Sequence, residues 1–190
     1  IQQIYLTTLS QQEHTAGQPS LREVLIEAVN LANATVSAAV PGGGTTLLCA
    51  LLLGAQAYIA NVGDSRAYLL SSNGLEQITR DHSLVDRLVE LGQLTEAEAV
   101  NHPQKNVLYR AVGQGGVLEV DTFVRAMSPG QRLLLCSDGL WGMISDSEIA
   151  QVIAATPSPQ AACNALVAAA NQAGGRDNIS AILVECAGEP

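Results

Sequence analysis

Three aspartates in this 190-residue sequence share one local context, and together they could bind a metal ion. Asp64 in NVGDSR, Asp138 in LCSDG and Asp177 in GRDNIS each stand where an apolar stretch meets a turn, beside glycine or asparagine. A single aspartate in such a place is an ordinary turn or cap residue. Three of them, in a sheet protein whose strand ends can lie together, favour a shared cation. Oxygen ligands without histidine or cysteine suit a hard ion, magnesium or manganese.

The stretch LLLCSDGLWG, residues 133–142, shows the problem that Asp138 poses. Four apolar residues, typical of a buried strand, run straight into Ser137, Asp138 and Gly139. A buried carboxylate without a partner is unfavourable, so Asp138 needs a cation, a set of hydrogen-bond donors, or water. The residues themselves leave these three alternatives open.

The charge balance and the apolar content exclude several classes of protein. Nine Lys and Arg residues against 18 Asp and Glu residues give a formal charge of −9, which argues against a nucleic-acid partner. Hydrophobic residues make up 47% of the chain and charged residues 14%, as in a globular protein. No apolar run approaches the ~20 residues needed to cross a bilayer. Residues 1–20 show no signal-peptide pattern, so no membrane partner is expected.

The four cysteines lie far apart, mostly inside apolar runs, and none of them forms a C-x-x-C pair. Zinc is therefore not expected. Buried, reduced thiols are typical of cytosolic proteins, so the sequence predicts a cytoplasmic location.

The hydrophobic patterns predict helices before and after a run of consecutive strands. Ser20 and Glu23 resemble a capping box that starts a helix over 21–39, and Asn73-Gly74 is a strong hairpin signal. The other expected elements are strands in 45–54, 55–63, 65–71, 75–80, 118–126, 131–139 and 178–186, two short helices in 83–107, helices from Ser145 to about 155 and from Pro159 to near Gly174, and a helix end at Ile4, Tyr5, Leu6 and Leu9. Tight turns between strands indicate an α+β fold with antiparallel sheets, in a single domain over 1–190.

Six blocks of this sequence resemble, in the same order, the metal-dependent phosphatases of the protein phosphatase 2C family in their bacterial form. The blocks are GGGTTL, ANVGDSRAYL, ITRDHSLV, LTEAEAVNHPQKNVLYRAVG, LLLCSDGLWGMI and GGRDNISAILV. Each block alone is a weak signal, but six in order across residues 42–184 are specific.

The resemblance implies a four-layer α/β/β/α sandwich of antiparallel sheets and a channel that holds two Mn²⁺ or Mg²⁺ ions. It implies hydrolysis of phosphoserine and phosphothreonine in proteins by metal-activated hydroxide. The implied partners are phosphorylated proteins and a Ser/Thr kinase that phosphorylates them. Asp138 and Asp177 match the family's metal ligands, and Asp64 matches an aspartate that helps Asp138 to hold a third, weaker ion in bacterial members. The insert 83–107 matches the flap beside the channel.

The first segment of the family pattern is absent from this sequence. The family begins with an arginine and an Asn-Glu-Asp segment, followed by Asp-Gly-x-Gly-Gly, whose aspartate bridges the two metals. Gly42 to Gly44 are not that motif, because no aspartate precedes them. Since the sequence begins with Ile1, we expect an N-terminally truncated phosphatase in which catalysis is lost or impaired.

The alternative is a non-catalytic, phosphatase-like module that binds or regulates other proteins. An Asp-Gly-x-Gly-Gly motif encoded directly upstream of Ile1 would favour the enzyme over this module. Truncation would also leave strands without neighbours, which predicts self-association through them.

Five further residues could have either a functional or a purely structural role. Arg66 could contact phosphate, but an ion pair with a strand-end aspartate is the interpretation we favour. His82 and His102 could shuttle protons, and for both we favour packing of the flap or capping of a turn. Trp141 is interpreted as core filling, and Asp81 as a solvated flap residue.

Overall fold

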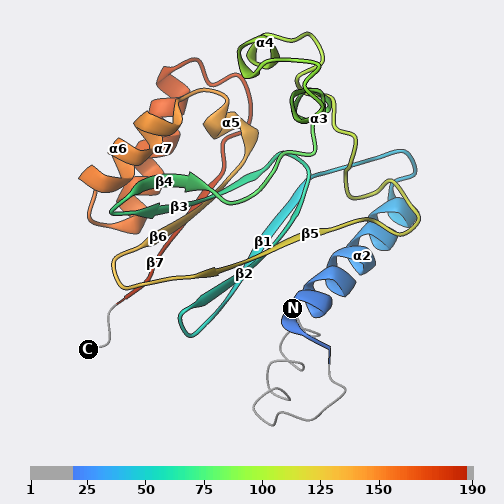
Figure 1. The fold of residues 1–190 in the computed structure, drawn as a ribbon, viewed down its shortest axis with the longest axis horizontal. Helices are drawn as coiled ribbons and strands as arrows, with labels where there is room; N and C mark the ends of the chain where they lie inside the picture. Colours follow the sequence, from blue (N-terminus) through green and yellow to red (C-terminus); the bar gives the residue numbers. More distant parts are fainter. Residues whose placement is uncertain (1–18, 188–190) are drawn as a thin grey trace. The chain divides into compact units, whose positions relative to one another are not determined.

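The computed structural model describes residues 19–187, and its elements follow the predicted order (Figure 1). The helices are α2 (Leu21–Ala39), α3 (Leu84–Glu90), α4 (Glu96–Val100), α5 (Asp138–Trp141), α6 (Asp146–Ala155) and α7 (Pro159–Gln172); the strands are β1 (Leu47–Leu53), β2 (Gln56–Val62), β3 (Arg66–Ser71), β4 (Gly74–Gln77), β5 (Asp121–Ala126), β6 (Arg132–Cys136) and β7 (Ala181–Glu185). The helix end expected at Ile4 to Leu9 lies outside the described residues. Within residues 19–187, no helix combines the length and the apolar character needed to span a membrane.

The chain falls into two compact units, each with its own hydrophobic core. The first unit contains the chain up to Leu51, Tyr58–Gly63 and His82–Val124, and the second contains Leu52–Ala57, Asp64–Asp81 and the chain from Arg125. The single domain over 1–190 stays a prediction.

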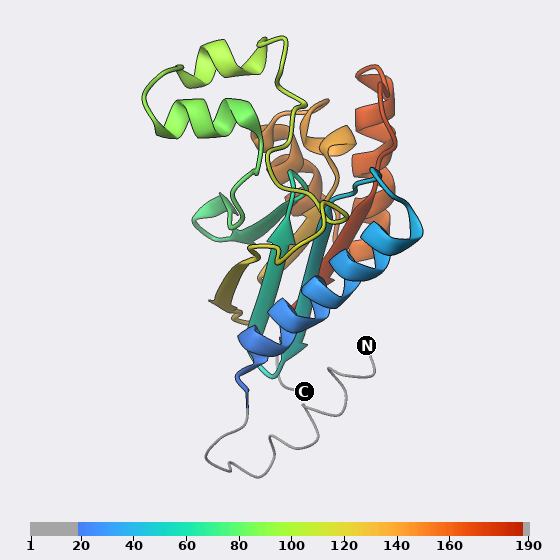
Figure 2. The ribbon, with the colours of Figure 1, turned by 90° about the vertical axis from the view of Figure 1, so that its right-hand side faces the viewer.

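In the first unit, α2 packs along a sheet with the strand order β1-β2-β5 (Figure 2). The helix begins at the predicted capping box, in which the Ser20 side chain accepts a hydrogen bond from the backbone of the third helical residue. Leu25 and Val29, four residues apart on one helix face, share a core cluster with Ala60 and Val62 of β2. The amphipathic spacing therefore places this helix as predicted.

The insert 83–107 contains the two short helices that the sequence predicts, α3 and α4, which contact each other (Figure 2). The Ser83 side chain caps α3 by accepting from the backbone N–H of Asp86. Thr95 and Glu98 cap α4 reciprocally, through side chain and backbone in both directions. Polar caps rather than an apolar core define α4, in which no residue is buried, whereas α3 buries Val85.

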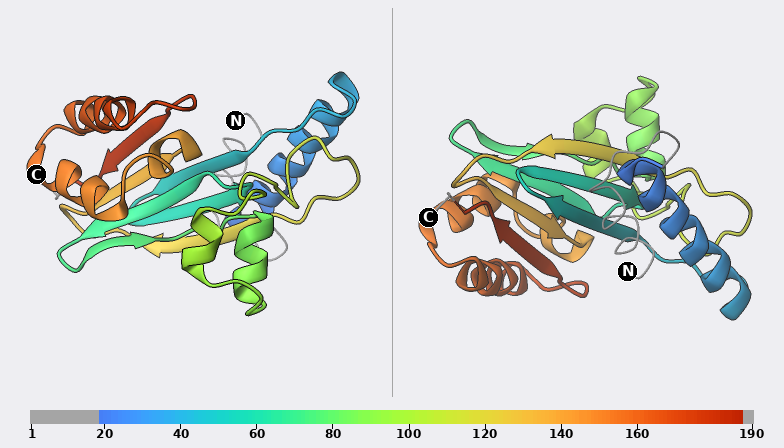
Figure 3. Two further views of the ribbon diagram at one scale, coloured as in Figure 1. Left: turned by 90° about the horizontal axis from the view of Figure 1, so that it is seen from above. Right: turned by 90° about the horizontal axis from the view of Figure 1, so that it is seen from below.

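The second unit is a four-stranded antiparallel sheet with the order β4-β3-β6-β7, on which α6 and α7 pack (Figures 1 and 3). Its core joins Leu134 of β6 and Leu183 of β7 to Ile149 and Ile153 of α6 and Leu166 of α7. With the first sheet, it gives the α+β fold that the sequence predicts.

The register of this second sheet gathers three strand ends at one place. Arg66 at the start of β3 is paired with Cys136 at the end of β6, and Cys136 is paired with Ala181 at the start of β7. Because β6 runs antiparallel to both neighbours, the start of β3, the end of β6 and the start of β7 lie at the same end of the sheet. The three predicted aspartates lie in the segments that adjoin these strand ends.

The prediction that Asp138 ends a strand is wrong by two residues. Strand β6 stops at Cys136, Ser137 is an N-cap residue, and Asp138 begins the four-residue helix α5. A single helical turn is too short to leave a periodic pattern in a sequence. The Ser137 hydroxyl donates to the Asn178 carbonyl at 3.2 Å and accepts from the Ser180 N–H at 3.0 Å, so the segment before β7 is tied to the start of α5.

Gly139 allows this segment to approach α5 so closely. A Cβ atom at position 139 would lie 2.3 Å from the carbonyl oxygen of Asn178, closer than any unstrained contact. Since the obstacle is backbone rather than a flexible side chain, only glycine fits without displacing one of the two segments.

We therefore expect Gly139→Ala to lower the free energy of unfolding by about 1–3 kcal/mol, the usual effect of overpacking. Urea unfolding followed by circular dichroism measures this change. Gly44→Ala is the matched control, because a Cβ there would meet its nearest atoms at an ordinary 3.6–3.7 Å. An equal effect of the two substitutions would show that the contact with Asn178 is unimportant.

Candidate metal centre

Asp64 lies in the turn between β2 and β3, directly after a glycine that the turn requires. Gly63 has a φ angle of +106°, and a Cβ there would lie 2.4 Å from the Thr46 side chain. Such a φ angle is readily adopted only by glycine. The backbone therefore fixes where the Asp64 side chain leaves the turn.

Burial and the negative charge of Asp138 raise the pKa of the Asp64 carboxyl from its ordinary 3.8 to about 6. Asp81 contributes to the same shift, and Arg66 opposes it with the smallest effect among these neighbours. Asp64 and Asp138 thus form a pair of partly buried carboxylates that repel each other.

The other two predicted ligands differ in their surroundings. Asp138 is partly buried, and its carboxylate accepts a hydrogen bond from the Gly139 N–H at 2.9 Å. Asp177 is exposed and accepts from the Asn178 N–H at 2.6 Å. In the part of the chain that the structure describes, no three His, Cys, Asp or Glu side chains come together in a way that could hold a metal ion. The fold therefore brings Asp177 to the same end of the sheet but does not complete a three-ligand cluster.

The Asp64–Asp138 pair fits a hard divalent cation in the chemistry of its donors. Carboxylate oxygens are the preferred protein ligands of Mg²⁺ and Mn²⁺, and Mg²⁺ usually takes about one or two carboxylates and keeps several waters. A cation between the two groups would remove the repulsion and the desolvation that raise the pKa of Asp64. Asp64 and Asp138 are the residues that would hold it.

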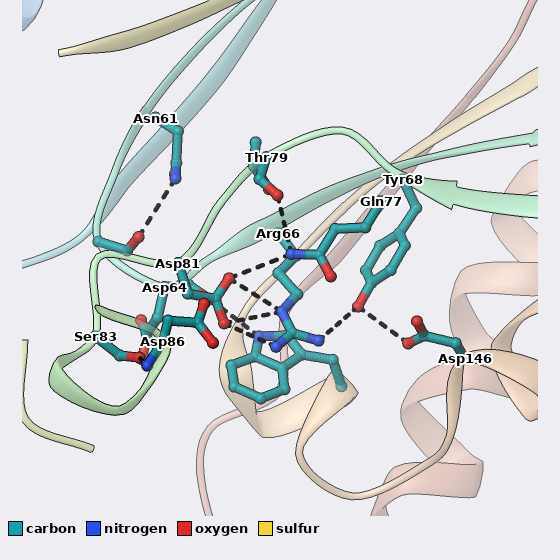
Figure 4. A network of polar contacts seen from close by, with 12 residues as sticks. Asn61, Asp64, Arg66, Tyr68, Gln77, Thr79, Asp81, Ser83, Asp86 and Asp146 are labelled. Atoms are coloured by element: carbon teal, nitrogen blue, oxygen red, sulfur yellow. Dashed lines mark hydrogen bonds and ion pairs between the residues drawn. The ribbon is translucent and has the colours of Figure 1, made fainter. Parts of the chain in front are cut away.

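Arg66 forms the predicted ion pair with an aspartate, but its partner is Asp81 rather than an aspartate at a strand end (Figure 4). Its Nε lies 3.0 and 3.1 Å from the two carboxylate oxygens of Asp81, and its Nη2 donates to Oδ2 at 2.7 Å. This bidentate geometry is the strong form of an arginine–carboxylate pair. Asp81 is only 4% exposed, so its interpretation as a solvated flap residue is wrong.

The remaining nitrogen of Arg66 is also engaged. Its Nη1 donates to the Tyr68 hydroxyl at 3.1 Å, and that hydroxyl donates to Asp146 at 3.1 Å (Figure 4). Burial raises the pKa of Tyr68 well above its ordinary value, so the phenol keeps the proton that it donates. Contact between Arg66 and a phosphate would require these bonds to break.

Trp141 does more than fill the core. Its indole Nε1–H donates to the backbone carbonyl of Asp64 at 3.0 Å. The Arg66 guanidinium carbon lies 3.6 Å from the centroid of its ring, in a cation–π contact. This role was not predicted from the sequence, because a helix of one turn leaves no periodic pattern that would relate Trp141 to Asp138.

The two candidate histidines of the first unit have the structural roles that the sequence analysis favoured. His82 is 1% exposed and hydrogen-bonds both backbone groups of Gly63. Its ring Nδ1 accepts from the Gly63 N–H at 3.0 Å, and its backbone N–H donates to the Gly63 carbonyl at 3.0 Å. His102 accepts from the Gln104 N–H at 3.2 Å, which caps a turn.

Related sequences show the same family along most of the chain. The family model for protein phosphatase 2C matches residues 5–97. The serine/threonine phosphatase stp of Listeria welshimeri is 46% identical over 144 residues, which make up 76% of this chain and 57% of that protein. Protein phosphatase PhpP of Streptococcus pneumoniae is 43% identical over 143 residues, 75% of this chain and 58% of that protein.

Solved structures of bacterial serine/threonine phosphatases have the same fold as this chain. The Mycobacterium tuberculosis serine/threonine phosphatase PstP/Ppp has a TM-score of 0.83 at 31% identity, covering 98% of this chain and 81% of that one. The catalytic domain of PstP, solved with two manganese ions, has a TM-score of 0.77 at 29% identity, covering 98% and 80%. This chain belongs to the protein phosphatase 2C family and has the fold of its phosphatases. It spans 57–58% of the length of the two curated relatives described above.

The raised pKa of Asp64 predicts how stability depends on pH. Between about 3.8 and 6, the folded chain keeps a proton that the unfolded chain has lost, so stability falls as the pH rises through this window. We expect Asp64→Asn to be more stable than the natural chain above pH 6, by about 1 kcal/mol because solvent screens part of the repulsion. The difference should vanish below pH 4.

Urea titrations in the presence of a chelator, at pH values from 3.5 to 8, measure this difference. Asp177→Asn is the control, because that exposed aspartate has no part in the repulsion. A constant difference between Asp64→Asn and the natural chain at all pH values would contradict the paired-carboxylate description.

Proposed function

We propose that this chain serves metal-dependent hydrolysis of phosphoserine and phosphothreonine in proteins. The observation that carries the proposal is the placement of two partly buried carboxylates, Asp64 and Asp138, at one end of the sheet in segments joined by the Trp141 hydrogen bond. Membership of the protein phosphatase 2C family supports the same activity. The set of ligands that we propose is Asp138 and Asp177 for the catalytic ions and Asp64 with Asp138 for a third, weaker one.

The proposed cofactor is Mn²⁺ or Mg²⁺, with two ions and a third as in bacterial members. The relative solved with two manganese ions supports this choice. A bound divalent cation would lower the pKa of a water molecule bound to it, and its positive charge would stabilise the negative charge on the phosphoryl oxygens. The chain's own residues orient this chemistry: Asp64 and Asp138 present carboxylate oxygens from two turns, and the Ser137 contacts with the Asn178–Ser180 backbone keep the turn of Asp177 beside them.

We further propose that catalysis by these 190 residues alone is impaired. The sequence contains no Asp-Gly-x-Gly-Gly motif, whose aspartate bridges the two metals in the family. Loss of even an outer partner of a metal ligand lowers activity about 10–100-fold, so we expect loss of a bridging ligand to reduce it at least about 100-fold.

The proposed partners are cytoplasmic phosphoproteins and a Ser/Thr kinase that acts on them. We also propose self-association through a sheet edge. Strand β7 ends its sheet, and Ile182 on it is 61% exposed. Light scattering that gives the mass of a monomer at micromolar concentration would contradict the association.

One observation favours the second candidate, a non-catalytic binding or regulatory module. In residues 19–187, three potential ligand side chains do not come together. A phosphatase-like domain that acts through partners would need no complete metal centre.

The test is hydrolysis of a phosphothreonine peptide by the 190-residue chain with Mn²⁺, beside an Asp138→Asn variant and a chelator control. We expect slow hydrolysis that needs Mn²⁺ and is lost in the variant, because Asp138 belongs to both the pair and the proposed catalytic ligands. Asp146→Asn is the matched control, an aspartate of the second unit that contacts Tyr68.

Hydrolysis that persists in Asp138→Asn would overturn the assignment of Asp138. No hydrolysis by the natural chain, together with no Mn²⁺ binding by calorimetry, would leave the binding module as the function of these residues.

A further inference from the structure

We propose that Trp141 is a positioning residue of the metal centre: it braces the turn that carries Asp64 to the helix that begins at Asp138. The inference rests on the proposed function, since it concerns the same pair of carboxylates. It assigns to Trp141 the positioning of two metal ligands, in addition to its packing in the core.

The brace is a hydrogen bond between the Asp64 turn and helix α5, two segments that continue beyond the paired residues Arg66 and Cys136. Indole is a donor only, and its single N–H is used on the Asp64 carbonyl at 3.0 Å. At the other end, Trp141 is the last residue of α5, whose turn is closed by the Gly142 N–H bond to the Asp138 carbonyl at 2.8 Å. One helical turn therefore links the donor to the Asp138 backbone.

The indole ring is itself held in place. The Arg66 guanidinium stacks on it with 3.6 Å between the guanidinium carbon and the ring centroid. Arg66 is fixed in turn by its bidentate pair with Asp81, and it follows Asp64 by only two residues. Trp141 therefore makes two contacts with this segment: a hydrogen bond to the Asp64 carbonyl and a stacking contact with Arg66. A planar guanidinium is suited to such stacking.

The two carboxylates supply the reason why a brace is needed. Asp64 and Asp138 are like charges at the same end of the sheet, in segments that the Trp141 hydrogen bond joins, and like charges favour separation of those segments. A contact that resists this separation keeps the ligands near the geometry that a cation requires, and a pre-organised site binds more tightly because less ordering remains to be done. Simple core packing by Trp141 would stabilise the fold without linking the two aspartates.

A double-mutant cycle separates these two roles without any metal. The four proteins are the natural chain, Trp141→Phe, Asp64→Asn and the double variant, unfolded in urea at pH 8 with a chelator. Phenylalanine keeps an aromatic ring under Arg66 but removes the donor. We expect Asp64→Asn to lower the unfolding equilibrium constant about fivefold in the natural chain and less than about twofold in Trp141→Phe, because the carboxylates can then separate.

Tyr68→Phe is the matched control. It removes a hydrogen bond from the same Arg66 network but touches neither Asp64 nor Asp138, so the fivefold effect of Asp64→Asn should persist in it. Should Trp141→Phe fail to fold, Arg66→Lys takes its place in the cycle, since lysine loses the planar stack that holds the indole.

Calorimetric titration with Mn²⁺ alone gives a second readout. We expect Trp141→Phe to bind Mn²⁺ about tenfold more weakly than the natural chain, and Tyr68→Phe to bind it with unchanged affinity. An additive cycle, or equal Mn²⁺ affinity in Trp141→Phe and a natural chain that binds the ion, overturns the brace. If the natural chain binds no Mn²⁺, the proposed function fails, and the cycle alone still decides whether Trp141 links the two turns.

Discussion

The approach of Asp64 and Asp138 at one end of a sheet is the constraint on which the turns of the second unit depend. Two partly buried carboxylates at one end of a sheet are unfavourable, and the raised pKa of Asp64 is the sign of that energy. The register of β3, β6 and β7 brings their segments to that end, and close backbone contacts hold them there.

Arg66, two residues after Asp64, does not neutralise the pair of carboxylates. Its nitrogens are directed to Asp81 and Tyr68, and its effect on Asp64 is smaller than the opposing effects of burial and Asp138. The arginine therefore balances the charge of Asp81 and leaves the Asp64–Asp138 pair negative. A site that keeps its negative charge in this way is suited to attract a divalent cation.

Much of the fold could be predicted from the sequence because the signals were local. Capping boxes at Ser20 and Thr95 marked where helices begin, and the apolar strands were punctuated by glycine turns. The approximate positions of the three aspartates also followed, since each adjoined an apolar stretch. That they share one end of a sheet depends on strand order and register, which are set by contacts between segments far apart in the sequence.

The polar partners within the site could not be predicted for the same reason. Nothing local to Arg66 says that it pairs with Asp81, fifteen residues away, rather than with Asp64, its near neighbour in the sequence. The helix α5 has a single turn and therefore no periodicity to detect, and its absence from the prediction concealed the spacing that brings Trp141 back to Asp64.

The identities of Gly139 and Trp141 follow from one physical requirement. The segment after β6 lies close to the segment before β7, and this approach leaves no room for a side chain at Gly139. The same segment lies close to the turn before β3, to which the Trp141 indole donates a hydrogen bond. Both residues act on backbone atoms, so they set where the aspartates are placed rather than what the aspartates are. Because displacements of about 1 Å are enough to impair a metal or catalytic site, such backbone contacts govern its performance more directly than the volume of the core does.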